Sequence, residues 1–255
     1  NGQRSTFCLS DVAERPILAP LTLDIPMDGH VLGLIRHNGS GKSTLLKLLP
    51  RQQAPTSGSI TLDGRTLDAW DDQALAHKAA YLAQHLPSAV GMTVRELVSL
   101  GRYPWHGSLG RFGEMDRQKT DEAMALTGVT PLADRLVDTL SGGEDTRLAH
   151  HAGGDTECLL LDEPISALDI AHQIEVLSLL RNLSQERGLG IIIVLHDINM
   201  ASRFCDNITV LHSGRVIRQG APETIMTPEA LQRIYGLPMD VIAHEPIGRP
   251  LAIAR

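Results

Sequence analysis

The sequence is poor in the residues that characterise several classes of protein. Its 255 residues include three cysteines, Cys8, Cys158 and Cys205, which are far apart and show no C-x-x-C spacing. We therefore expect reduced, structural thiols rather than a metal or redox site. The formal net charge is −7, from 23 Lys and Arg against 30 Asp and Glu. This balance argues against a nonspecific nucleic-acid binder, which needs clustered cations.

Long apolar runs are missing as well. Even the longest uninterrupted apolar stretches are short, as in residues 191–195. They stay far below the ~20 residues that span a bilayer. The first residues carry no apolar stretch behind a basic cluster, so we expect no secretory signal. The length allows one large domain or two small ones with a sizeable core.

Short apolar segments bounded by glycine and proline alternate with segments of helical periodicity. The predicted strands cover 21–25, 31–35, 58–62, 79–84, 158–161 and 190–195, with a last pair, 208–211 and 215–217, around a Ser213-Gly214 turn. The predicted helices cover 45–49, 93–98 behind a Thr93/Glu96 capping box, 116–126, 170–187 before Gly188, 223–226 and 228–235. In the long helix Ile170, Ile174, Leu177, Leu180 and Leu183 recur at helical spacing. The alternation predicts an α/β fold with a mainly parallel sheet and helices on both faces.

One stretch has the pattern of a phosphate-binding loop between a strand and a helix. Residues 36–44 follow the apolar strand 31–35 and make up this loop. They are Arg36, His37, Asn38, Gly39, Ser40, Gly41, Lys42, Ser43 and Thr44. Glycines let backbone N–H groups surround phosphate oxygens, and the helix start adds unpaired donors. We expect Lys42 to reach the terminal phosphates and the Ser43 hydroxyl to bind Mg²⁺. The alternative is an ordinary Gly/Ser turn before a core helix.

A second strand ends in two acids. Residues 159–161 are leucines, followed by Asp162 and Glu163. At the carboxyl end of a buried strand beside the loop, Asp162 is placed to hold a Mg²⁺-bound water and Glu163 to act as general base. Apolar strands ending in acids are common, so the prediction depends on the loop occurring 120 residues earlier in the same alternating pattern.

Residues 140–144, Leu-Ser-Gly-Gly-Glu, lie between the loop and the acidic strand. In that order they resemble the signature motif of ATP-binding-cassette (ABC) ATPases. Further positions match the same family: Gln84 resembles its Q-loop glutamine, residues 166–169 its D-loop, and His196 its switch histidine. The resemblance extends over most of the chain through six ordered motifs.

The resemblance implies a RecA-like P-loop core with a mainly parallel sheet, an N-terminal antiparallel β-subdomain and an inserted helical subdomain. We expect the core at 1–85 and 151–240, the helical subdomain at 86–150 and an irregular tail at 241–255. It implies ATP and Mg²⁺ as cofactors, with Ser43, Gln84 and Asp162 around the metal, and Glu163, His196 and Gln84 in catalysis.

The family further implies a head-to-tail homodimer, in which Ser141, Gly142 and Gly143 of one copy close on the phosphates bound by the other. Its partners are expected to be polytopic permease subunits and, indirectly, a substrate-binding protein, with the ATPase peripheral on the cytoplasmic face of the inner membrane. Residues 91–98, 101–107, 168–173 and 195–201 resemble the ATPases of iron-siderophore, haem and vitamin B12 importers. Residues 103–107 and 169–173 are most similar to the ferric hydroxamate (ferrichrome-type) group.

The sequence departs from the family at three places. Arg36 replaces the first glycine of the loop, no aromatic residue occurs between Phe7 and Lys42 to stack on adenine, and 145–157 lacks the usual long apolar helix. Residues 7–20 also look short, as though part of a strand and its turn were missing. His150 and His151 diverge on a helix as adjacent residues, so we expect no metal pair there. A catalytically weak, nucleotide-sensing cassette, a soluble cassette without a membrane partner and a haem or vitamin B12 importer remain alternatives.

Overall fold

The computed structural model describes residues 6–35, 39–82, 92–100, 113–126, 130–136, 156–166, 168–244 and 248–255. The strands are β1 (Thr6–Glu14), β2 (Leu18–Pro26), β3 (Val31–Ile35), β4 (Ser57–Leu62), β5 (Arg65–Thr66), β6 (Ala79–Leu82), β7 (Cys158–Leu161), β8 (Gly190–Leu195), β9 (Asn207–His212), β10 (Arg215–Gly220), β11 (Met239–His244) and β12 (Arg249–Ala254). The helices are α1 (Lys42–Leu48), α2 (Asp72–Lys78), α3 (Val94–Leu100), α4 (Glu114–Leu126), α6 (Ile170–Arg187), α7 (Ile198–Phe204), α8 (Pro222–Ile225) and α9 (Pro228–Tyr235), with 3-10 turns at η1 (Leu67–Ala69) and η3 (Thr130–Leu132).

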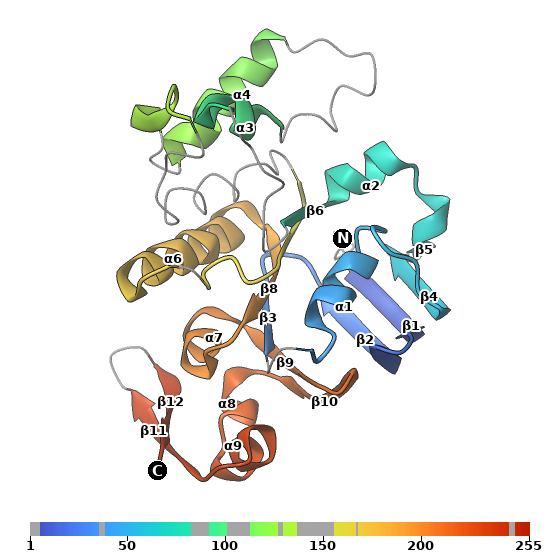
Figure 1. The fold of residues 1–255 in the computed structure, drawn as a ribbon, viewed down its shortest axis with the longest axis vertical. Helices are drawn as coiled ribbons and strands as arrows, with labels where there is room; N and C mark the ends of the chain where they lie inside the picture. The colour runs from blue at the N-terminus through green and yellow to red at the C-terminus, as the bar shows by residue number, and fades with distance from the viewer. Residues whose placement is uncertain are drawn as a thin grey trace.

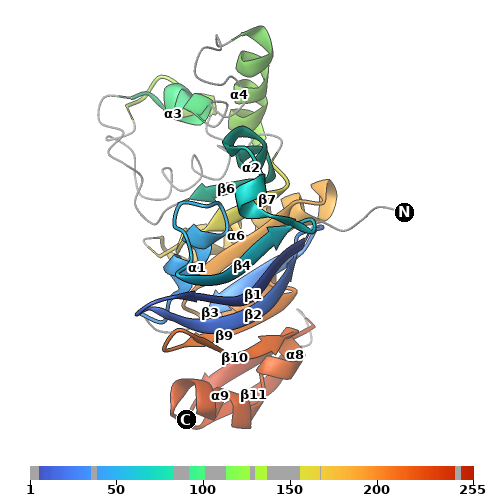
Figure 2. The ribbon, with the colours of Figure 1, turned by 90° about the vertical axis from the view of Figure 1, so that its right-hand side faces the viewer.

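The strands form a central sheet and a smaller antiparallel sheet. The central sheet has the order β10-β9-β3-β8-β7-β6, in which only the β9–β10 hairpin is antiparallel. The smaller sheet has the order β2-β1-β4-β5 and lies across one side of the central sheet (Figure 2). The predicted α/β fold, with a mainly parallel sheet and an N-terminal antiparallel subdomain, is confirmed.

Two apolar layers explain why the central strands are apolar on both faces. Along β8, Ile192 and Val194 pack with the antiparallel sheet and α1, whereas Ile191, Ile193 and Leu195 pack with α6, α7 and α9. A separate small cluster joins α3 to α4 around Val94, Val98 and Met124, at the end of the molecule opposite the C-terminus (Figure 1). Helices therefore cover the face of the sheet that the antiparallel subdomain leaves free.

The local signals in the sequence act as expected. The Thr93 hydroxyl and the Glu96 carboxylate form the predicted capping box at the start of α3. Gly188 ends α6 in the left-handed region, with φ 68°. The three cysteines are free thiols. Residues 7–20, which look short in the sequence, lie in β1, the three joining residues and the start of β2, and the β1–β2 register is irregular between Leu9 and Val12 and between Val12 and Glu14.

Two sequence-based predictions are wrong. The tail is a β-hairpin, β11–β12, with all six pairs in regular antiparallel register. Pro246, Gly248 and Pro250 have the appearance of breakers, but Pro250 is tolerated in a two-stranded hairpin, where each strand is an edge. Ile170 belongs to the predicted apolar face of α6, yet it is 70% exposed. As the first residue of the helix, it lies beyond the part of α6 that contacts the sheet.

Asp206 joins three elements of the core. Its carboxylate accepts a hydrogen bond from the Val31 backbone N–H at 2.9 Å and one from the Arg181 guanidinium on α6. Its own N–H donates to the Val31 carbonyl at 2.8 Å. Burial of Asp206 opposes ionisation, but the hydrogen bonds from Arg181 and Val31 outweigh burial and lower its pKa below 3.8.

We expect Asp206→Asn to lower the free energy of unfolding by about 2 kcal/mol at pH 7, since a charge-assisted hydrogen bond is lost. A carboxylate whose pKa is lower in the folded state stabilises the fold at pH values above its unfolded pKa of 3.8. This stabilisation is lost as the pH falls through the folded-state pKa. The deficit should therefore shrink at pH 3, as measured by urea unfolding. Asp240→Asn is the control, because Asp240 pairs with Arg255 at the surface. A deficit that is equal at both pH values would contradict the assignment.

Candidate functional site

The predicted phosphate loop is a glycine turn between β3 and α1. Gly39 and Gly41 have φ values of 78° and 93°, in the left-handed region that favours glycine. Gly41 directly precedes the first helical residue, Lys42. The Ser40 carbonyl accepts a hydrogen bond from the Gly214 N–H at 3.2 Å, so the β9–β10 turn supports the loop.

One polar side chain of the loop, that of Ser40, is buried. Ser40 is 5% exposed, and its hydroxyl has no hydrogen-bond partner among the residues that the structure describes. A buried hydroxyl of this kind costs free energy unless it is paired. A phosphate oxygen in the loop would satisfy it, so the residues present fit an anionic ligand.

Gly41 has a second constraint besides its dihedral angle. A Cβ atom at Gly41 would lie 2.4 Å from Leu18 Cδ2, because the β1–β2 hairpin packs against the loop. A Cβ at Gly39, by contrast, would meet no described atom within 4 Å. Both glycines have positive φ. Comparing alanine substitutions at the two positions therefore separates the effect of backbone strain from that of overlap with Leu18.

We expect Gly41→Ala to weaken ATP binding at least tenfold, since strain of about 1–2 kcal/mol adds to the overlap with Leu18. Gly39→Ala carries the strain alone and should lose about half as much binding free energy. Titration with a fluorescent ATP analogue measures both. Equal losses in the two variants would show that packing against Leu18 does not shape the loop.

Asp162 lies at the carboxyl end of β7, next to the loop. It is 4% exposed and accepts hydrogen bonds from the Ser43 hydroxyl at 3.0 Å and the Tyr81 hydroxyl at 3.3 Å. Its N–H donates to the Leu82 carbonyl of β6 at 3.0 Å. Burial and the charge of Asp162 raise the pKa of Tyr81, so its phenol stays a donor. Tyr81 is the site residue that the sequence did not predict.

The Asp162–Ser43 contact fits a hard divalent cation. No group of three or more His, Cys, Asp or Glu ligands occurs in the described part of the chain. Mg²⁺ does not need one, because it is usually held by one or two protein oxygens together with water and substrate phosphates. A serine hydroxyl and a carboxylate 3.0 Å apart are such a pair.

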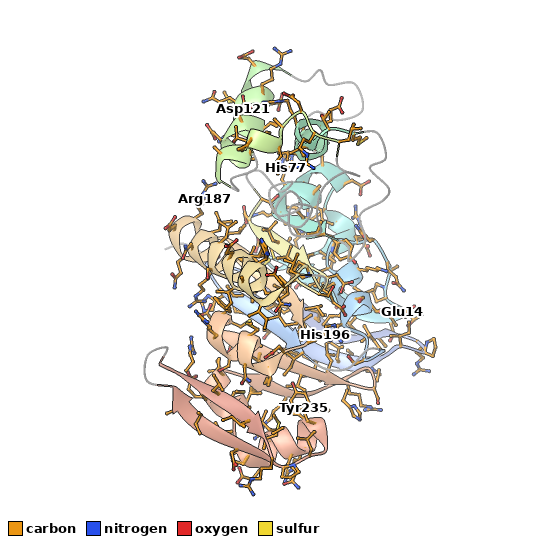
Figure 3. All side chains as sticks on the ribbon, turned by 60° about the vertical axis from the view of Figure 1, so that its left-hand side comes forward. Glu14, His77, Asp121, Arg187, His196 and Tyr235 are labelled. Carbon is orange, nitrogen blue, oxygen red and sulfur yellow. The ribbon has the colours of Figure 1, made fainter. Side chains whose placement is uncertain are left out.

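Glu163 and His196 meet at the same edge of the sheet. Since β7 and β8 are parallel neighbours, the residues after their carboxyl ends lie side by side, and His196 Nε2 is 2.8 Å from Glu163 Oε1. The Glu163 side chain is 12% exposed and that of His196 is 43% exposed. His196 lies near the middle of the molecule (Figure 3). Glu163 has φ 54°, an uncommon value for a non-glycine residue that is found at functional sites.

Lys42 places a buried cation beside these acids. It is 4% exposed. Burial lowers the pKa of Lys42, and the charges of Glu163 and Asp162 act against that shift. A cation, two carboxylates, a serine hydroxyl and a histidine thus converge around a glycine turn. Such a set can bind a metal-complexed phosphate chain and accept a proton from water.

The structure therefore brings together Gly39, Ser40, Gly41, Lys42, Ser43, Asp162, Glu163 and His196, with Thr44 buried in the first turn of α1. The remaining predicted site residues, His37, Asn38, Gln84, Ser141, Gly142 and Gly143, lie outside the described residues, as does Arg36. Their roles stay predictions.

Comparison with protein families identifies a match that includes the loop and the acidic strand. Residues 18–166 match the model of the family described as ABC transporter. That range covers more than half of the chain and includes both Lys42 and Glu163.

Two curated relatives match almost the whole chain. The ferric enterobactin transport ATP-binding protein FepC of Escherichia coli is 42% identical over 235 residues, which cover 91% of this chain and 86% of FepC. The iron(3+)-hydroxamate import ATP-binding protein FhuC of Bacillus subtilis is 36% identical over 242 residues, with coverages of 94% and 90%. Among solved structures, cbiO1 of Clostridium perfringens, part of the ABC transporter complex cbiONQ, aligns with a TM-score of 0.76 at 28% identity, covering 91% of this chain and 94% of that chain.

Proposed function

The chain belongs to the ABC transporter family and is an ATPase of that type, and from this premise we propose how it hydrolyses ATP and what that hydrolysis drives. In general terms, the chain is the ATP-binding subunit of an importer of the iron-siderophore and haem type. The observation that carries the proposed mechanism is the meeting of two contacts, Ser43–Asp162 and Glu163–His196, at one edge of the sheet.

The described side chains have roles that follow from their positions, whereas the roles of His37, Asn38 and Gln84 follow from the resemblance to the family. The loop from His37 to Thr44 surrounds the phosphates, and Lys42 neutralises the terminal ones. Ser43 and Asp162, with Gln84, would hold Mg²⁺, which supplies charge neutralisation on the β- and γ-phosphates. Tyr81 orients the Asp162 carboxylate by its hydrogen bond.

Glu163 accepts the proton of the attacking water. The contact between Glu163 Oε1 and His196 Nε2 holds the carboxylate in place before ATP arrives. We propose that His196 then contacts the γ-phosphate. Burial strengthens the charge interactions of Lys42 and Asp162, because water is largely excluded from these two residues.

We propose that two copies form the complete site. In this arrangement Ser141, Gly142 and Gly143 of one copy contact the phosphates bound to Lys42 of the other. Helical residues within 86–150 would then face the permease, with the core at 1–85 and 151–240. No helix in the described part of the chain is long and apolar enough to cross a membrane. We propose that a separate permease carries the cargo and that the ATPase lies on the cytoplasmic face of the inner membrane; the names of FepC, a transport ATP-binding protein, and FhuC, an import ATP-binding protein, support this division of labour.

For the cargo, we propose an iron(III)-hydroxamate siderophore delivered by a binding protein. Residues 103–107 and 169–173 support this class, and so does the identity with FhuC. The higher identity with FepC supports ferric enterobactin as the cargo, and the hemin import ATP-binding protein HmuV of Bordetella bronchiseptica, 39% identical, supports haem. The test must therefore compare the three.

The test has two stages. Phosphate release by the purified chain should require ATP and Mg²⁺ and should stop with EDTA; no release with Mg²⁺ present would contradict the hydrolysis mechanism. The chain reconstituted in proteoliposomes with its co-purified permease and binding protein should then import ⁵⁵Fe-ferrichrome in preference to ⁵⁵Fe-enterobactin or haem. Uptake of either competitor instead would overturn the hydroxamate assignment and leave the hydrolysis mechanism standing.

A further inference from the structure

The C-terminal hairpin is fastened to the helix that follows His196. Strand β12 packs against α7 (Figure 1). The Asn199 side chain on α7 bonds both polar backbone groups of one strand residue: its Nδ2 donates to the Ala252 carbonyl at 3.0 Å, and its Oδ1 accepts from the Ala252 N–H at 2.7 Å. Near the end of the same short helix, the Ser202 hydroxyl donates to the Pro250 carbonyl at 2.7 Å. Because the Asn199 amide bonds both the N–H and the C=O of Ala252, it fixes the orientation of α7 relative to β12 as well as their separation.

The same helix starts at the candidate site. Asp197 caps α7, and its Oδ1 accepts from the Asn199 N–H at 2.7 Å and the Met200 N–H at 3.1 Å. His196 directly precedes this cap. The Asn199 backbone is thus held by the cap that adjoins His196, while its side chain is held by β12.

Among the described residues, His196 is held by its ring contact with Glu163 and by its place directly after β8. Its side chain is 43% exposed, so packing does not fix the ring, and the strand before it ends at Leu195. On its buried side α7 packs through Ile198, Ala201 and Phe204. A second side of α7 is held by the hairpin, through Asn199 and the buried Ser202. The orientation of α7 therefore depends on both sides, and the direction in which His196 leaves the strand depends on α7.

We propose that Asn199 is a positioning residue for ATP hydrolysis: by fastening β12 to α7 it holds His196 at Glu163. This inference rests on the proposed role of His196. It also gives the β11–β12 hairpin a purpose in catalysis that reaches beyond covering α7. A merely structural Asn199 would lower stability without affecting turnover by the folded protein.

The test compares Asn199→Ala with a matched loosening of the same strand. Arg249 on β12 pairs with Glu223 on α8 at 2.8 Å, so Glu223→Gln removes the charge of this pair and weakens the link between the hairpin and α8, whereas the hydrogen bonds to α7 stay. We expect Asn199→Ala to reduce kcat about tenfold, since small misplacements of a catalytic group reduce rates by up to about 10². KM for ATP should change less than about twofold. Ser202→Ala, a milder change, should reduce kcat about threefold, and Glu223→Gln should leave kcat unchanged.

A double-mutant comparison separates positioning from a general effect. In a His196→Ala background, measured by slow phosphate release over hours, adding Asn199→Ala should change the rate less than about twofold. A further tenfold loss there, or an unchanged kcat in both folded Asn199→Ala and Ser202→Ala, would overturn the proposal. Full activity of His196→Ala alone would contradict the role of His196 itself. The two failures are therefore distinguishable.

Discussion

Glu163→Gln is expected to reduce ATP turnover about 10³-fold while leaving ATP binding intact, since a general base contributes about 10²–10⁴. Glutamine has the same shape as glutamate and still reaches His196 across the present 2.8 Å contact, but it cannot accept a proton from water. Bound ATP should therefore persist. Phosphate release at saturating ATP measures turnover, and size-exclusion chromatography with ATP and Mg²⁺ should reveal a stable dimer.

Glu157→Gln is the matched control. Glu157 lies just before the opposite end of the same strand, where it is 47% exposed and pairs with Lys78. Glu157→Gln should leave ATP turnover within about twofold of that of the unsubstituted protein. If Glu163→Gln hydrolysed ATP as fast as this control, Glu163 would not be the base.

The second large effect is expected for Lys42→Ala, which should weaken ATP binding about 100-fold. A hydrogen bond to a charged group is worth about 1.5–3 kcal/mol, and each 1.4 kcal/mol is about tenfold in affinity. Lys42 is also the buried cation beside Asp162 and Glu163. Without it, the triphosphate would face the two carboxylates without the cation that lies beside them. Displacement of a fluorescent ATP analogue measures the affinity.

Lys47→Ala provides the control for Lys42→Ala, because Lys47 is an exposed lysine in the last turn of the same helix. It removes the same charge and leaves the loop unchanged. A loss below about threefold in Lys42→Ala, or an equal loss in both variants, would mean that Lys42 does not contact the phosphates.

The site also shows how the two acids that follow β7 have different contacts although they are adjacent. The Asp162 carboxylate accepts hydrogen bonds from Ser43 and Tyr81. The next residue, Glu163, leaves the strand in the left-handed region and turns to His196. A single change in backbone direction thus gives neighbouring carboxylates separate partners.

The sequence by itself determined the features that depend on nearby residues. Strands and helices followed from apolar periodicity, glycine turns and caps such as Thr93 with Glu96. The glycine turn before Lys42 and the acids after a leucine strand predicted the site, because parallel strands bring their carboxyl ends to one edge. The ordered motifs were enough to identify the family.

Only the tertiary structure decided the features made by distant segments. The contact of Tyr81 with Asp162 joins residues 81 positions apart, and that of Asn199 with Ala252 joins residues 53 apart. Gly41 is confined by Leu18 from another strand. The hairpin β11–β12 forms where the sequence shows prolines, because α7 and α9 give its apolar face a surface to pack on. Local patterns specify which elements form, whereas side-chain contacts between them depend on how the elements pack, which periodicity and turn signals do not encode.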